Sequence, residues 1–189
     1  MDAPHGMSST SLGPMPTDRL VRTVDERIVQ APVETIFDLA ADVERWPAYL
    51  SHYRYVRFLH GDSNAIRVVE MSANRPFGFV EWPTWWTSRM SVVDPKASSC
   101  PAVRFTHVAG VTKGMEVEWT FEPNSNGTLV RIIHVWNGPA WPLIGEMTAR
   151  FVIAPVFVHG IASRTLAGLA GVAERRSHGQ GARHANGEV

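Results

Sequence analysis

The sequence has a single cysteine and almost no lysine. Cys100 is the only cysteine among 189 residues, so no intrachain disulfide can form, which fits a reducing compartment and predicts a cytoplasmic protein. Lysine occurs only at positions 96 and 113, and 18 basic residues balance 18 acidic ones. A formal net charge of zero gives no reason to expect nucleic acid or an acidic membrane surface as a partner.

Long apolar runs are also missing. The longest candidate, residues 151–173, is interrupted by Pro155, His159 and Arg164, so we expect no membrane insertion. The first 17 residues are rich in Ser, Pro and Gly and lack the apolar core of a signal peptide. We therefore expect three segments: a disordered N-terminal segment (1–18), one globular domain (19–175) and a disordered polar tail (176–189).

Metal and cofactor motifs are absent from the sequence. The eight histidines show no spacing typical of a metal site, and cysteine is not available as a second type of ligand. Gly138-Pro139 is a turn signal and forms no phosphate-binding loop. We therefore expect neither a metal nor another cofactor.

The periodicity of apolar residues predicts an α+β domain. Helical spacing after Pro32 and after Asp42 predicts two short helices, with Asp42 as the N-cap of the second. Alternation predicts strands at 19–30, 53–60, 65–73, 84–93, 103–111, 115–121 and 128–136, with a loop at 74–78. From about residue 142 the period becomes helical, and Pro155 should kink that long helix. A curved antiparallel sheet covered by one apolar helix would leave a cavity between them.

The strand around 84–93 carries an unusual set of side chains. Alternation divides it into two faces, Trp85, Thr87 and Arg89 on one and Trp86, Ser88 and Met90 on the other. An aromatic ring, a hydroxyl and a guanidinium on one face could line an apolar cavity with a polar end. The alternative is a tryptophan-rich core strand whose arginine reaches solvent.

Two stretches near the N-terminus resemble a known superfamily. The run from Ile28 to Leu39, followed by Asp42-Val43-Glu44-Arg45-Trp46-Pro47, is similar to the opening of the START/Bet v 1-like superfamily, in its polyketide cyclase branch. The resemblance covers residues 19–175. It implies a helix-grip fold, in which a curved antiparallel sheet wraps around a long C-terminal helix and encloses a hydrophobic cavity.

The predicted strand at 84–93 makes the resemblance more specific, to aromatase/cyclases of bacterial aromatic polyketide pathways. These proteins carry a Trp-x-Ser-x-Arg strand followed by Asp-Pro, which the run from Trp85 to Arg89 and then Asp94-Pro95 resemble. They also carry a cavity tyrosine, matched by Tyr53, and a second arginine, whose position holds His107 here. The resemblance implies Arg89, Tyr53 and His107 as catalytic residues.

The alternation of side chains along the predicted strands extends the candidate site to further residues. If Arg104 and Arg131 point outward and no β-bulge intervenes, nine side chains face the cavity: Tyr53, Trp85, Thr87, Arg89, His107, Met115, Trp119, His134 and Trp136. Each has a plainer interpretation. Arg89 could form a buried ion pair with Glu70 or Glu118, and the histidines could be hydrogen-bonded core residues.

The resemblance implies a polyketide aromatase/cyclase that folds a poly-β-ketone and cyclises it by aldol addition and dehydration. Arg89 would polarise a carbonyl, and Tyr53 or His107 would move protons, on a substrate delivered by an acyl carrier protein. The alternative is a non-catalytic carrier of a lipid, quinone or other hydrophobic aromatic ligand, for which Arg89 would be merely ion-paired.

Overall fold

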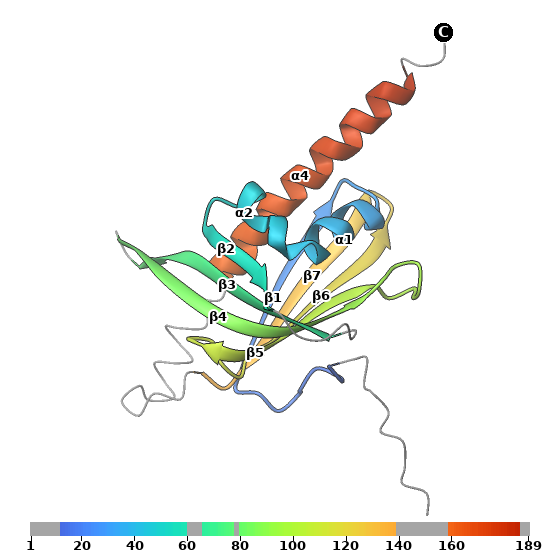
Figure 1. Ribbon diagram of the computed structural model, residues 1–189. Coiled ribbons are helices and arrows are strands. Elements are labelled where there is room, and N and C mark those ends of the chain that lie inside the picture. Colours follow the sequence, from blue (N-terminus) through green and yellow to red (C-terminus); the bar gives the residue numbers. More distant parts are fainter. Residues whose placement is uncertain (1–11, 60–65, 78–79, 139–158, 186–189) are drawn as a thin grey trace, which may run out of the picture.

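The computed structural model describes residues 12–59, 66–77, 80–138 and 159–185. Seven antiparallel strands form one curved sheet in the order β1-β7-β6-β5-β4-β3-β2 (Figure 1). The elements are β1 (Val21–Val29), α1 (Val33–Ala41), the 3₁₀ helix η1 (Val43–Arg45), α2 (Trp46–Tyr49), β2 (Tyr53–Phe58), β3 (Ile66–Phe77), β4 (Val80–Val93), β5 (Ala102–Gly110), β6 (Glu116–Asn124), β7 (Gly127–Trp136) and α4 (His159–Ala185).

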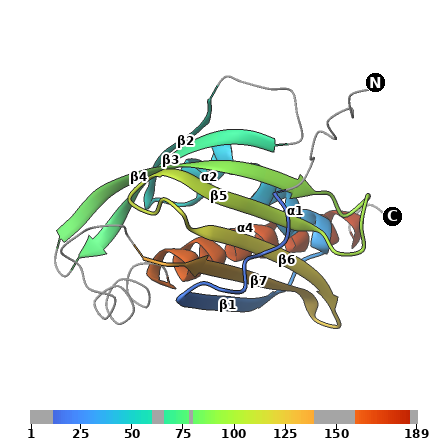
Figure 2. The same cartoon turned by 90° about the horizontal axis from the view of Figure 1, so that it is seen from below.

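The helices cover one face of the sheet. Figure 2 shows the strands from below, with α1 and α4 on the far side. The core lies between these layers, where Leu169, Ala170 and Ala173 of α4 are fully buried. The helix-grip fold predicted from the sequence is therefore confirmed. No helix in the described ranges is long and apolar enough to cross a membrane.

Helix α4 can be compared with the prediction only at its C-terminal end. Its described part begins at His159, so the predicted kink at Pro155 lies outside the described residues. The tail expected to be disordered from residue 176 is helical as far as Ala185. Arg176 helps to hold the start of this extension, because its Nη2 donates to the hydroxyl of Tyr49 at 2.8 Å.

One local prediction holds in part and a second is wrong. Asp42 is the N-cap residue of η1 but makes no side-chain capping bond, and the second helix is a 3₁₀ turn followed by a single α-turn. The indole of Trp46 fixes this turn by donating to the carbonyl of Leu39 at 3.0 Å. The loop expected at 74–78 is largely strand, because Asn74 pairs with Pro83 and β3 continues to Phe77.

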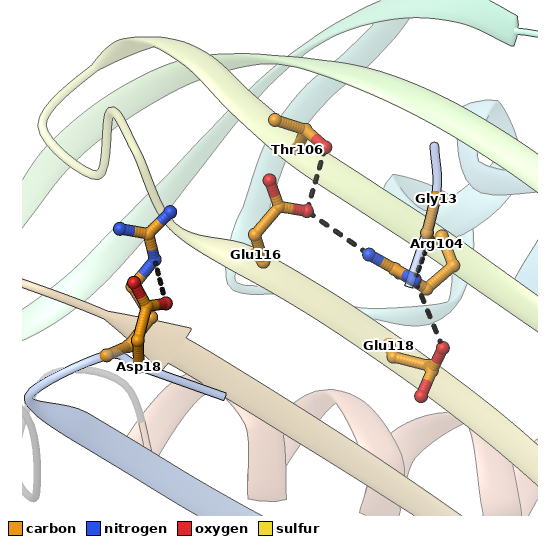
Figure 3. A network of polar contacts seen from close by, with 7 residues as sticks. Gly13, Asp18, Arg104, Thr106, Glu116 and Glu118 are labelled. Atoms are coloured by element: carbon orange, nitrogen blue, oxygen red, sulfur yellow. Dashed lines mark hydrogen bonds and ion pairs between the residues drawn. The ribbon is translucent and has the colours of Figure 1, made fainter. Parts of the chain in front are cut away.

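The convex face of the sheet carries an ion-pair network centred on Arg104 (Figure 3). Its guanidinium lies 3.4 Å from both Glu116 and Glu118 of β6, and Nη1 also donates to the Gly13 carbonyl at 2.7 Å. Thr106 donates to the same Glu116 oxygen at 2.8 Å. This arrangement confirms the predicted outward orientation of Arg104. Arg131 likewise points outward and pairs with Glu26 and Glu122.

Candidate ligand-binding cavity

A small cavity lies between the sheet and helix α4. It encloses about 60 Å³ and is lined by Trp46, Tyr53, Met71, Trp86, Phe105, His107, Thr112, Met115, Val117, Trp119, Ile132, His134, Ile161, Ala162 and Thr165. This volume is smaller than the roughly 150 Å³ that holds a benzene ring in an engineered apolar cavity. A ring-sized ligand therefore requires some of these side chains to move.

Aromatic rings form much of the wall. Trp46, buried at the start of α2, contacts Tyr53 edge-on at a centroid distance of 5.2 Å and Trp119 at 5.8 Å. Tyr53 in turn contacts Trp86 at 6.2 Å. The two contacts of Tyr53 are edge-to-face and that between Trp46 and Trp119 is tilted, and edge-to-face contacts add to the stability gained from burying the rings. The result is a set of flat apolar surfaces, which suit a planar or extended unsaturated ligand.

His107 is a polar group in this aromatic wall. Its ring lies nearly parallel to that of Trp86, with a centroid distance of 6.0 Å and an interplanar angle of 19°. Its Nδ1 lies 2.6 Å from the hydroxyl oxygen of Thr112. Both side chains are buried. The imidazole therefore adds a group that can donate or accept a hydrogen bond to the wall of the cavity.

Two further histidines flank the cavity. His134 lines it from β7 and is half-buried, with Nδ1 3.4 Å from the hydroxyl of Thr23 on β1. His52 is buried beside the Tyr53 ring, and its Nε2 lies 3.1 Å from the hydroxyl of Thr165 on α4. Thr165 lines the cavity, so the hydrogen bond with His52 links the wall formed by α4 to the start of β2.

Five residues of the predicted inward set line the cavity, namely Tyr53, His107, Met115, Trp119 and His134. Trp136 is buried as predicted but does not belong to the lining. Its indole nitrogen instead donates to the carbonyl of Lys113 at 3.0 Å, which anchors the turn between β5 and β6.

The prediction chose the wrong face of β4 as the one that points into the cavity. Trp86 pairs with Met71 and Ser88 pairs with Val69, and all four side chains are buried, so this face of β4 is the inner one. By alternation Trp85, Thr87 and Arg89 lie on the convex face. Trp85 is 49% exposed, and the Arg89 side chain is exposed as well.

The surroundings of Arg89 also exclude the predicted ion pairs. Glu70 pairs with Arg57, and Glu118 pairs with Arg104. Within the described parts of the chain Arg89 forms no ion pair. The alternative of a tryptophan-rich core strand whose arginine reaches solvent is therefore the one that describes β4.

Sequence reasoning missed several members of the site. Trp46, Trp86, Thr112 and Thr165 all line the cavity, and Trp86 takes the place that the prediction gave to Trp85. The sequence offered a signal for Trp86, because the alternation of the same strand places it on the face opposite to Trp85. For Thr112 and Thr165 there was none, since one sits in a turn and the other on a helix whose orientation the sequence leaves open.

The lining carries polarity without fixed charge. Its polar side chains are those of Tyr53, Thr112, Thr165 and two histidines, together with the indoles of Trp46, Trp86 and Trp119, and no Asp, Glu, Lys or Arg of the described residues is part of it. No group of three or more potential ligands in the described ranges could hold a metal ion. Any proton transfer at the cavity wall therefore falls to imidazole or phenol groups.

The chain is similar to several known proteins, one by sequence and others by structure. A Streptomyces halstedii protein named "Putative polyketide cyclase" is 28% identical over 111 residues, which span 59% of this chain and 96% of that protein. The structure of a Thermus thermophilus protein superposes with a TM-score of 0.68 at 21% identity, covering 83% of this chain and 99% of that one.

Two aromatase/cyclases are also similar in structure. The Zhui aromatase/cyclase from Streptomyces sp. R1128 gives a TM-score of 0.63 at 21% identity, over 82% of this chain and 94% of that one. The di-domain ARO/CYC StfQ of the steffimycin pathway gives 0.66 at 17% identity, over 85% of this chain and 53% of that one. Residues 29–158 match the family described as polyketide cyclase/dehydrase and lipid transport. The chain belongs to this family.

Proposed function

We propose that this protein is a polyketide cyclase whose cavity widens, by movement of its lining side chains, around a poly-β-ketone chain, folds that chain and catalyses its aldol addition and dehydration. One observation carries the proposal. Tyr53 and His107, two groups able to exchange protons, line the same aromatic cavity, and each ring contacts that of Trp86, at centroid distances of 6.2 and 6.0 Å. A cavity built only for storage needs no such pair.

The chemistry begins with a methylene between two carbonyls, whose protons are acidic enough for an imidazole to remove. His107 takes this proton, and the resulting enolate carbon forms a bond to a carbonyl carbon further along the chain. The new alkoxide takes a proton from the imidazolium or from Tyr53. Loss of the hydroxyl and a neighbouring proton as water then forms the carbon–carbon double bond that begins the aromatic ring.

The walls supply the geometry of this reaction. A flexible poly-β-ketone can close in several registers, and flat rings on several sides restrict which methylene meets which carbonyl. The buried Trp46, Trp86 and Trp119 also keep bulk water away from the enolate. The chain would arrive tethered to an acyl carrier protein, because free poly-β-ketones cyclise spontaneously.

The test is product analysis with a reconstituted minimal polyketide synthase. Spontaneous cyclisation competes with the catalysed reaction. The ratio of directed to spontaneous aromatic products therefore reports the activity of the added protein. We expect wild type to direct one product, and His107→Gln to lower the ratio by about 100-fold, at the low end of what acid–base groups contribute. Tyr53→Phe should lower it less, since a water can replace the phenol as a donor.

Arg89→Ala is the matched comparison, because this side chain lies on the convex face. We expect it to leave the product ratio unchanged. If Arg89→Ala alone lost the directed product, the guanidinium of Arg89 would have a role in the mechanism. If adding wild-type protein left the mixture of spontaneous products unchanged, the proposal would be overturned. Quinone binding by that same protein sample would then identify a carrier.

A further inference from the structure

We propose that two copies of this chain pair antiparallel along the outer edge of β1, which joins their sheets into one across a two-fold axis. Strand β1 stands at one end of the strand order, and Figure 2 shows it at one margin of the sheet. Strand β7 occupies one edge of β1, and no strand in the described ranges pairs with the other edge. The proposal concerns assembly and does not depend on the activity of the cavity.

The outer edge of β1 lacks the backbone features that usually prevent pairing between molecules. β1 runs for nine residues, contains neither proline nor lysine, and pairs with β7 without a shift in register. Such an edge offers a row of backbone donors and acceptors to another strand. The opposite edge of the sheet is protected, because β2 has only six residues and a register shift between Tyr53 and Tyr55 interrupts its pairing with β3.

The convex-face side chains of β1 form a self-complementary series. By alternation they are those of Arg22, Val24, Glu26 and Ile28, and Leu20 lies immediately before the strand. All five side chains are exposed, with exposed fractions of 59% for Leu20, 37% for Val24 and 45% for Ile28. Along this row an apolar residue is followed in turn by arginine, an apolar residue, glutamate and an apolar residue. In the reverse direction the apolar positions coincide and the two charges change places.

This series favours one antiparallel register. If Val24 lies on the two-fold axis, it faces Val24 of the second copy, Arg22 faces Glu26, and Leu20 faces Ile28. The last two contacts occur twice by symmetry. Side chains directly opposite each other on one face of an antiparallel pair interact, and opposite charges there are stabilising. A shift of two residues in either direction would set Arg22 and Glu26 opposite apolar side chains and lose both ion pairs.

The two charged residues are available for such contacts. Arg22 is exposed and forms no ion pair within the parts of the chain that the structure describes. The Glu26 side chain remains 47% exposed although it pairs with Arg131. A carboxylate has two oxygens and can accept from a second guanidinium. Charges on an edge strand commonly keep copies apart, but the opposite signs of Arg22 and Glu26 on either side of Val24 make antiparallel pairing attractive.

Sedimentation equilibrium of the full-length chain, over a range of concentrations, measures the assembly. We expect a dimer of twice the 20.9 kDa of one chain. In Arg22→Glu two glutamates would face each other, and in Glu26→Arg two arginines, so each variant alone should raise the dissociation constant about 10- to 100-fold. An equimolar mixture of the two variants should recover the dimer, because every charge then meets its opposite. Circular dichroism checks that both variants are folded.

Cysteine substitution tests the register. In a Cys100→Ser background, Val24→Cys would place a thiol opposite itself on the two-fold axis, and mild oxidation should then give a covalent dimer. Val93→Cys is the matched control, because Val93 is 38% exposed but lies at the end of β4, away from β1. It should stay largely monomeric under the same oxidation.

Three results would overturn the proposal. The first is a wild-type chain that remains monomeric at every concentration. The second is a dimer that persists in both charge variants, or folded charge variants whose mixture does not recover it, since β1 would then not form the interface. The third is equal cross-linking of Val24→Cys and Val93→Cys, which would indicate random collision instead of a defined register.

Discussion

Replacing Arg104 by methionine should lower the free energy of unfolding by about 2–3 kcal/mol. The side chain is 8% exposed and lies between Glu116 and Glu118, which are 15% and 23% exposed. Removing one partner of a fully buried ion pair costs about 3–5 kcal/mol, because the other charge is left without compensation. Water reaches both glutamates in part, so the expected loss lies below that range.

Methionine is chosen because it keeps the aliphatic packing of the arginine stem. The loss then reports the charge, together with the bond from Nη1 to the carbonyl of Gly13. Replacing Glu116 and Glu118 by glutamine in the Arg104→Met background should restore part of the stability, since the buried carboxylates are gone. Partial recovery of this kind distinguishes an electrostatic loss from a packing defect.

Urea denaturation followed by tryptophan fluorescence measures these changes as shifts of the midpoint at constant slope. Arg89→Met is the matched control, on the neighbouring strand and the same face, with no ion pair in the described ranges. It should change stability by less than about 0.5 kcal/mol. Equal effects of the two substitutions would refute the assignment of Arg104 as the centre of the convex-face network.

Three further substitutions test the construction of the site. Gly110→Ala should destabilise the protein by about 2–4 kcal/mol in thermal denaturation, because it combines a positive φ with a 2.3 Å contact to the carbonyl of Trp85. Gly114→Ala should cost only about 1 kcal/mol, since its φ is similar but its nearest neighbour is 4.0 Å away, and equal losses would contradict the steric argument. Thr165→Val should cost about 1–2 kcal/mol in urea denaturation by removing the buried partner of His52, and an unchanged midpoint would show that this bond adds nothing.

The sequence predicts the fold well where each local signal has one interpretation. Residues 115–121 alternate between apolar and polar side chains, and β6 follows that pattern. Asn124-Ser125-Asn126-Gly127 predicts a hairpin, and the β6–β7 turn lies there with Gly127 at φ +128°. The loop predicted at 74–78 fails because its turn-forming residues are outweighed by continuous pairing between β3 and β4.

The site is harder to predict because neighbouring strands decide which face of β4 points into the cavity. Trp85 and Trp86 are adjacent, and each parity of β4 offers an aromatic ring followed by a hydroxyl. Local sequence therefore cannot choose between the two faces. The choice is made by the pairing of Trp86 with Met71, which requires the register of a different strand.

Contacts between distant residues explain what sequence reasoning missed altogether. His52 and Thr165 are 113 positions apart and meet only because α4 crosses the sheet near β2. Thr112 is close to His107 in sequence, but a bulge and a glycine with positive φ are needed to turn its side chain back. Neither feature leaves a periodic signal, so neither can be derived from alternation.

The distribution of charge between the two faces constrains the chemistry of the cavity. Arg57, Arg89, Arg104 and Arg131 all lie on the convex side, and among the described residues the cavity lining has no Asp, Glu, Lys or Arg. A lining without fixed charge does not favour an anionic ligand in the ground state. In the proposed cyclase, the proton transfer would then fall to His107 and Tyr53 of the lining.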